Sequence, residues 1–130
     1  MRLSLARSFI LTTLLFGATG CSNTRSTVST YVKGVVSGDF EAASGAACEV
    51  SRTDISAESW NQFTLKNDID KIDVSSLGFS RGSGDIASFR LRGIIRGNSV
   101  TMRFHLRMLK DVPCPNGINL LGDLRGFEPG

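Results

Sequence analysis

The sequence has few of the residues from which metal and redox sites are built. Its 130 residues include 3 cysteines and 1 histidine. The cysteines are Cys21, Cys48 and Cys114, so no Cys-x-x-Cys pair is present. His105 completes a zinc site with two thiolates only if a carboxylate joins them, because structural zinc takes four ligands. We therefore predict that the protein uses no metal or other cofactor.

Motifs that mark common catalytic sites are also missing. The chain has no Gly-x-Ser-x-Gly elbow, no Gly-x-x-x-x-Gly-Lys phosphate loop and no His-Glu-x-x-His pair. Asp68 and Asp70 are close in sequence, but we interpret them as solvated loop acids. These absences favour a protein that binds and does not catalyse.

No apolar run is long enough to cross a bilayer, which needs roughly 20 residues. The run at residues 9–18 has about half that length and follows a basic start, Arg2 and Arg7, that carries no acid. Small residues follow the run. A basic N-terminal region, a short apolar segment and small residues before the cleavage site are typical of a secretory signal. We predict that residues 1–20 are a signal peptide and that the chain is exported.

The end of this segment, Ala18-Thr19-Gly20-Cys21, resembles the lipobox of bacterial lipoproteins, although the commonest form has Leu where this chain has Ala18. The resemblance implies that Cys21 receives a diacylglyceryl group and anchors the protein to the bacterial cell membrane. In a Gram-negative cell, Ser22 after the cysteine would permit sorting of the protein to the outer membrane. The alternative is cleavage after Gly20 by ordinary signal peptidase, which leaves Cys21 as a free thiol.

Lipidation of Cys21 leaves an even number of cysteines for an oxidising compartment. We therefore expect Cys48 and Cys114 to form a disulfide. In the chain-entropy model, a disulfide that closes a loop of this length stabilises the fold by roughly 4 kcal/mol. The alternative interpretation is a pair of catalytic or metal-binding thiols.

Charge is distributed unevenly along the chain. The formal net charge is +3 and includes Arg2 and Arg7 of the signal segment. Residues 39–73 contain 8 acids and 3 bases, whereas residues 81–110 contain 7 bases and 1 acid. The simplest interpretation is that the two halves neutralise each other in the fold.

We divide the mature chain into a lipidated cysteine and tether at 21–27 and a single domain at 28–130. Apolar residues with the spacing of one helix face follow the tether. They are Val28, Tyr31, Val32, Val35 and Val36. Gly38 is the expected stop of this helix, and Asp39 the cap of a second helix rich in small residues. A third helix is expected from Ser56, with Ile55 and Trp60 as a hydrophobic staple.

After about residue 70 the spacing of apolar residues changes from that of a helix to the alternation of strands. Residues 86–96 and 99–110 alternate apolar and polar residues around Gly97-Asn98, which predicts a β-hairpin. The two prolines of residues 111–117 exclude a regular central strand there. We predict a short last strand at 118–121 and an irregular end at 122–130.

A two-residue loop at Gly97-Asn98 would place Arg92 opposite Arg103 and Leu91 opposite Phe104, with all apolar residues on one side. The other side is basic. Its arginines are Arg90, Arg92, Arg103 and Arg107. Two like charges that face each other on adjacent strands repel each other. We therefore expect an anionic group nearby to offset this repulsion.

These four arginines are the candidate binding residues, because guanidinium groups bind carboxylates and phosphates bidentately. An anionic envelope component or an acidic protein would suit them. The alternative is that they pair with the acids of residues 39–73 or keep a strand face soluble. Nucleic acid is not expected, because Phe89 and Phe104 fall on the opposite side and provide no stacking platform.

The segment Tyr31-Val32-x-x-Val35-Val36-x-Gly38-Asp39-Phe40-x-x-Ala43 is similar to the opening of small exported NTF2-like (cystatin-like) domains. The resemblance implies an α+β fold with two or three N-terminal helices packed on a curved antiparallel sheet. Such domains serve as binders, assembly parts and enzymes. We predict a lipid-anchored, non-catalytic binding module at the cell envelope. The alternatives are a pocket domain for a small apolar ligand or simple acid–base chemistry, and a structural spacer.

Overall fold

The computed structural model describes the backbone of residues 23–83 and 85–130 and the side chains of residues 24–80 and 85–130. The predicted signal peptide, residues 1–20, and the predicted lipidation site, Cys21, lie outside the described residues. The helices are α2 (Asn23–Ser37), α3 (Phe40–Ala46), the 3-10 helix η2 (Glu49–Asp54) and α4 (Ala57–Lys66). The strands are β1 (Ile69–Ser83), β2 (Ile86–Ile95), β3 (Asn98–Leu109), β4 (Val112–Pro113) and β5 (Asp123–Pro129). This order confirms the predicted α+β class.

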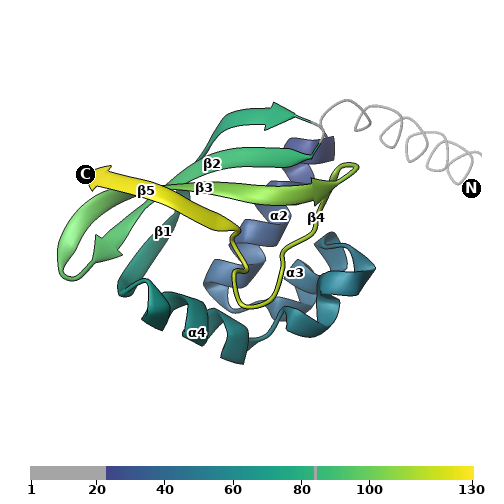
Figure 1. Cartoon of the computed structure of the whole chain (residues 1–130), viewed down its shortest axis with the longest axis horizontal. Helices are drawn as coiled ribbons and strands as arrows, with labels where there is room; N and C mark the ends of the chain where they lie inside the picture. Colours follow the sequence, from purple (N-terminus) through teal and green to yellow (C-terminus); the bar gives the residue numbers. More distant parts are fainter. Residues whose placement is uncertain (1–22, 84) are drawn as a thin grey trace, which may run out of the picture.

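The strands form one antiparallel sheet, and α2 crosses one side of it. β1, β2 and β3 are neighbours in chain order, and β4 and β5 both pair with the other edge of β3. In Figure 1, α2 crosses behind the sheet while α3 and α4 lie beside its lower end. None of the described helices combines the length and hydropathy that a bilayer span requires.

The predicted first helix is confirmed, but it begins earlier than expected. Val28, Tyr31, Val32 and Val35 are completely buried, as their spacing on one helix face requires. The helix ends before Gly38, whose φ of 86° suits a residue without a Cβ. Its first residue is Asn23, so residues 23–27, predicted as part of a tether, are the first turns of α2.

The caps predicted for the next two helices are present. The carboxylate of Asp39 accepts a hydrogen bond from the amide of Ala42 at 3.2 Å and caps α3. The hydroxyl of Ser56 accepts from the amide of Ser59 at 3.2 Å and caps α4. Trp60 stacks on the buried Phe63 with ring centroids 5.7 Å apart. Local sequence signals therefore placed the starts of both helices.

The predicted hairpin is present and its two faces are as expected, but its register is wrong by two residues. Phe89 pairs with Phe104, and Arg103 lies opposite Arg90 and not opposite Arg92. Since successive side chains alternate between faces, a shift of two residues leaves every side chain on its predicted face. The buried face consists of Ala87, Phe89, Leu91, Ile95, Val100, Met102, Phe104, Leu106 and Met108.

The register differs because the turn is Arg96-Gly97 and not Gly97-Asn98. Arg96 and Gly97 have φ of 51° and 78°, the positive values that a type I′ turn requires at both central positions. Asp68 stabilises this uncommon conformation of an arginine. Its carboxylate accepts hydrogen bonds from Arg96 Nε and Nη2 at 3.0 and 2.7 Å, and its carbonyl accepts from the Arg96 amide at 3.3 Å. The adjacent Gly97 amide donates to the carboxylate of Asp70 at 2.8 Å.

The C-terminal segment is more ordered than the sequence indicated. The predicted strand at 118–121 is wrong: Leu120 and Leu121 are completely buried in the core and lie outside the strands. The segment predicted to be irregular contains β5, which pairs with residues 100–105 of β3. Leu120 also accepts a hydrogen bond from the Tyr31 hydroxyl at 2.6 Å, so this segment is fixed to α2.

Candidate functional site

The four predicted binding residues, Arg90, Arg92, Arg103 and Arg107, lie together on the outer face of β2 and β3. We call this set the arginine face. All four are exposed. The apolar residues beside them on the strands are buried in the same core as the apolar residues of α2. The structure therefore brings the predicted residues onto one surface, because all four alternate with core residues along the two strands.

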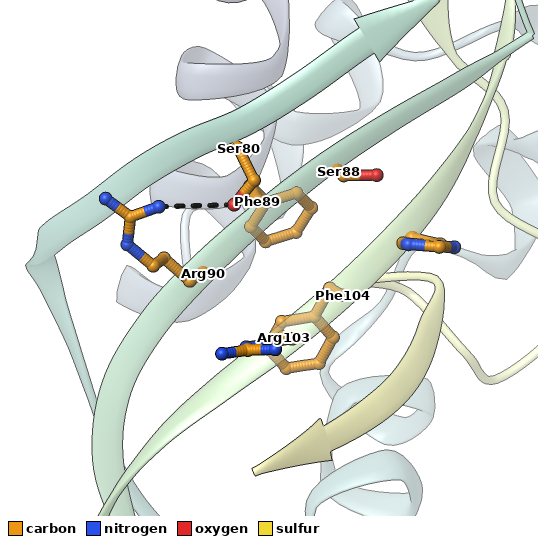
Figure 2. A pocket seen from close by; sticks show the side chains of 7 residues that line it. Ser80, Ser88, Phe89, Arg90, Arg103 and Phe104 are labelled. Atoms are coloured by element: carbon orange, nitrogen blue, oxygen red, sulfur yellow. Dashed lines mark hydrogen bonds between the residues drawn. The ribbon is translucent and has the colours of Figure 1, made fainter. Parts of the chain in front are cut away.

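Arg90 and Arg103 are direct cross-strand partners at the centre of this face. Figure 2 shows both side chains on adjacent strands, with the hydrogen bond from Arg90 to Ser80 drawn as a dashed line. Arg90 Nη1 donates to the hydroxyl of Ser80 at 3.2 Å, and Arg103 Nη2 contacts Glu128 Oε1 at 2.8 Å. A like-charge pair directly opposite on one face is unfavourable by itself. Separate polar partners on β1 and β5 therefore position the two guanidinium groups.

A shallow hollow of about 470 Å³ lies at this pair. Its polar lining consists of Ser80, Ser88, Arg90, Arg103 and His105. It is also lined by Phe89 and Phe104, whose side chains are almost completely buried and stack with ring centroids 5.3 Å apart. Guanidinium and hydroxyl donors around a solvent-open hollow suit a carboxylate or phosphate group.

Sequence reasoning missed Arg125, which extends the basic surface onto β5. Arg125 Nε donates to His105 Nδ1 at 3.2 Å, and Arg125 Nη2 lies 3.6 Å from Asp123 Oδ2. The alternation of Asp123 and Arg125 around the half-buried Leu124 was a signal for a strand. In the sheet, His105 lies opposite Ser88 of β2.

Arg92 and Arg107 occupy the ends of the arginine face. Arg92 pairs with Asp73 of β1 in the sheet register. Hydrogen bonding from the Ser75 hydroxyl lowers the pKa of the Asp73 carboxyl, and the nearby charges of Arg92 and Lys71 lower it further. Arg107 forms no ion pair with the side chains of 24–80 and 85–130. It borders a depression of about 860 Å³ beside the disulfide.

The expected neutralisation between the acidic and basic halves is only partial. Arg96 pairs with Asp68 at 2.7 Å, and Arg92 lies opposite Asp73. Arg103 instead pairs with Glu128, which belongs to β5. The centre of the arginine face is therefore partnered by β5 and by a serine, and not by the acids of residues 39–73.

Cys48 and Cys114 form the predicted disulfide, with their Cα atoms 5.2 Å apart. The Cys48 amide donates to Pro113 O at 2.8 Å, and the hydroxyl of the buried Ser51 donates to Pro115 O at 2.7 Å. These bonds join the start of η2 to β4 and to the segment after it. Among the described residues no cluster of His, Cys, Asp and Glu has the arrangement of a metal site.

Tyr31 and Trp60 serve the core and not a ligand pocket. Tyr31 is completely buried, and burial raises the pKa of its hydroxyl, which is already used in the bond to Leu120 O. Trp60 packs against the core through Phe63. Neither residue lines the hollow at Arg90 and Arg103 or the depression beside the disulfide.

We compared the chain with models of protein families, with curated proteins and with solved structures. No family model, curated protein or solved structure matches it. The comparisons thus give no indication of a catalytic function, and the function is inferred from the residues and their geometry.

Proposed function

We propose that this protein is an exported, lipid-anchored binding module that recognises an anionic partner at the cell envelope through its arginine face. The signal pattern of residues 1–20 and the lipobox-like end at Cys21 support the anchor. The disulfide between Cys48 and Cys114 supports an oxidising compartment outside the cytoplasm.

The observation that carries the binding proposal is the direct opposition of Arg90 and Arg103 across a solvent-open hollow. Two like charges at neighbouring positions cost free energy in the unbound protein. An anionic group between them would relieve this repulsion and accept charge-assisted hydrogen bonds from both guanidinium groups. Binding would thus be strongest for a ligand that bridges the two residues.

The chemistry of the hollow favours carboxylates and phosphates on an envelope component or an acidic protein. It does not favour nucleic acid, because Phe89 and Phe104 are buried and offer no ring for base stacking. The order of the elements, helices followed by an antiparallel meander, supports assignment of the fold to the NTF2-like class. The pocket function found in some such domains has less support, because the Tyr31 hydroxyl is already paired with Leu120 O.

The binding proposal is tested with the full chain purified from host membranes in non-ionic detergent. Calorimetry would measure the binding of a polyglutamate peptide and of inorganic phosphate to the wild type, R90Q/R103Q and R52Q/K66Q. The control removes two exposed cations from η2 and α4, outside the hollow. We expect R90Q/R103Q to weaken binding by about tenfold or more, and R52Q/K66Q to change it little.

Equal weakening in both double variants would show that only overall charge matters, and the binding site would then be rejected. The anchor is tested separately by the intact mass of the same preparation. A chain that starts at Cys21 and carries a diacylglyceryl group is expected. A chain without lipid would reject the anchor, whatever the calorimetry shows.

A further inference from the structure

The start of α2 would lie close to the membrane if Cys21 carries lipid, and this inference rests on that proposed anchor. α2 begins at Asn23, two positions after Cys21. Two residues span at most about 7 Å even when fully extended. A lipid on Cys21 would therefore bring the first turn of α2 to the surface of the membrane, with no long tether between them.

A groove of about 790 Å³ runs along this part of α2 and is closed on its other side by β1. Arg25, Ser26, Ser29 and Lys33 line the helix side, at positions that share one helix face. The β1 side is displaced from its regular pairing with β2, because the register is interrupted between Asp73 and Gly78. This interruption shapes the wall that Leu77 and Phe79 contribute to the groove.

The groove combines cations with an apolar wall. The Arg25 guanidinium lies 5.3 Å from the centroid of the Phe79 ring, a cation–π contact that holds the side chain over the groove. Neither Arg25 nor Lys33 forms an ion pair with the carboxylates of 24–80 and 85–130. Asp73, the nearest acid along β1, lies opposite Arg92 of β2. The positive charge of the groove is thus available to a ligand.

We infer that this groove receives the headgroup of an anionic phospholipid from the membrane that holds Cys21. Arg25 would contact the phosphate, while Lys33 supplies positive charge at the far end of the groove. Leu77 and Phe79 provide an apolar surface for the glycerol and the start of the acyl chains. Lipidation brings one end of the groove within reach of the bilayer, and its charge is complementary to anionic lipid.

A lipid bound in the groove would determine the direction in which the arginine face points. That face lies on the side of the sheet away from α2. A domain held through the α2–β1 groove would direct Arg90 and Arg103 away from the bilayer. The two basic surfaces would then serve different partners, the groove lipid and the arginine face an anionic group in the aqueous space.

The test uses the full chain, purified from host membranes and reconstituted into vesicles of phosphatidylcholine alone or of phosphatidylcholine with phosphatidylglycerol. Hydrogen–deuterium exchange would be measured for the backbone amides of residues 74–79. Phosphatidylglycerol is expected to slow their exchange roughly fivefold in the wild type and in R52Q/K66Q. R25Q/K33Q is expected to lose this difference while its circular dichroism spectrum and melting temperature stay unchanged.

Exchange that is the same in both kinds of vesicle would overturn the inference, as would an equal loss in both double variants. The proposed anchor fails in a different way. A protein without lipid on Cys21 would not float with vesicles of phosphatidylcholine alone, whereas a lipidated protein with an empty groove would float with them.

Discussion

The two faces of the β2–β3 hairpin are built from alternating residues of the same strands, yet different parts of the protein determine them. On the inner face, Phe89, Leu91, Met102 and Phe104 are almost completely buried. On the outer face the arginines are exposed, and Arg90 and Arg103 are each positioned by a single contact, to Ser80 and Glu128 respectively. The inner face is therefore fixed by many packing contacts and the outer face by a few polar ones.

This difference separates stability from recognition. Removing a buried side chain costs both its transfer free energy and that of the cavity left behind. Removing an exposed charge usually changes stability by less than about 0.5 kcal/mol. A binding surface can thus be altered residue by residue while the fold stays intact, which makes the arginine face accessible to mutational tests.

The largest effect is expected for Phe104→Ala on the inner face. The centroid of the Phe104 ring lies 5.3 Å from that of the stacked Phe89 ring and 6.4 Å from that of the tilted Phe63 ring. Its removal is expected to lower the free energy of unfolding by about 3–5 kcal/mol, because the stacked neighbours cannot fill the space. Urea unfolding followed by circular dichroism measures this. A loss below about 1 kcal/mol would contradict the central role of this ring.

A second experiment asks whether the core is stable without the covalent link between Cys48 and Cys114. The double variant Cys48→Ala with Cys114→Ala is expected to lose roughly 2–5 kcal/mol, since the unfolded chain gains conformational freedom. Wild type in reducing agent should unfold at the same urea concentration as the variant. If reduction leaves the midpoint of the wild type unchanged, the disulfide contributes little and the core alone determines stability.

Tyr31→Phe tests a polar contact within the buried layer. The variant is expected to lose about 1–3 kcal/mol at neutral pH, because the Leu120 carbonyl loses its donor. Burial raises the pKa of the Tyr31 hydroxyl, whereas in the unfolded chain it ionises near pH 10. The folded state therefore retains a proton that the unfolded state loses, and the stability that depends on it falls as pH rises above about 10.

Unfolding of the wild type and of Tyr31→Phe is compared at pH 8 and pH 11. The wild type should lose more stability than the variant over this interval, because only the wild type carries the buried hydroxyl. Equal losses in the two proteins would show that ionisation of other groups accounts for the whole effect.

The smallest effect is expected on the outer face. Arg103 and Glu128 are more than half exposed, with exposed fractions of 59% and 63%. Glu128→Gln is expected to change the free energy of unfolding by less than about 1 kcal/mol, as is usual for exposed ion pairs. Its effect on polyglutamate binding should be a gain, because a competing carboxylate is removed. A large loss of stability would show that β5 depends on this pair.

Much of the fold could be predicted from local sequence. The helix caps at Asp39 and Ser56 follow from residues within three positions of each cap. The alternation in residues 86–109 correctly separated core side chains from the arginine face. Gly93 fits the same pattern, but the reason for a glycine there became clear only in the fold, since an added Cβ would lie 2.3 Å from the Lys71 carbonyl oxygen.

Other features required contacts between distant segments. The hairpin register depends on Asp68, in the turn before β1, and on Asp70 of β1, which both bind the Arg96-Gly97 turn. The end of the chain becomes a strand because the open edge of β3 accepts it. Neither contact is visible in the hydrophobic pattern of the segment concerned.

The sequence by itself determined the class of fold, the starts of α3 and α4, the side of the sheet on which each hairpin residue lies and the choice of Cys48 and Cys114 as a pair. The tertiary structure decided which arginines are neighbours, what holds them apart and where the tail lies. The physical reason is that a periodicity of two encodes the face of a strand but is unchanged by a shift of two residues. Register and edge pairing are therefore set by long-range hydrogen bonds and by the fit of the whole core.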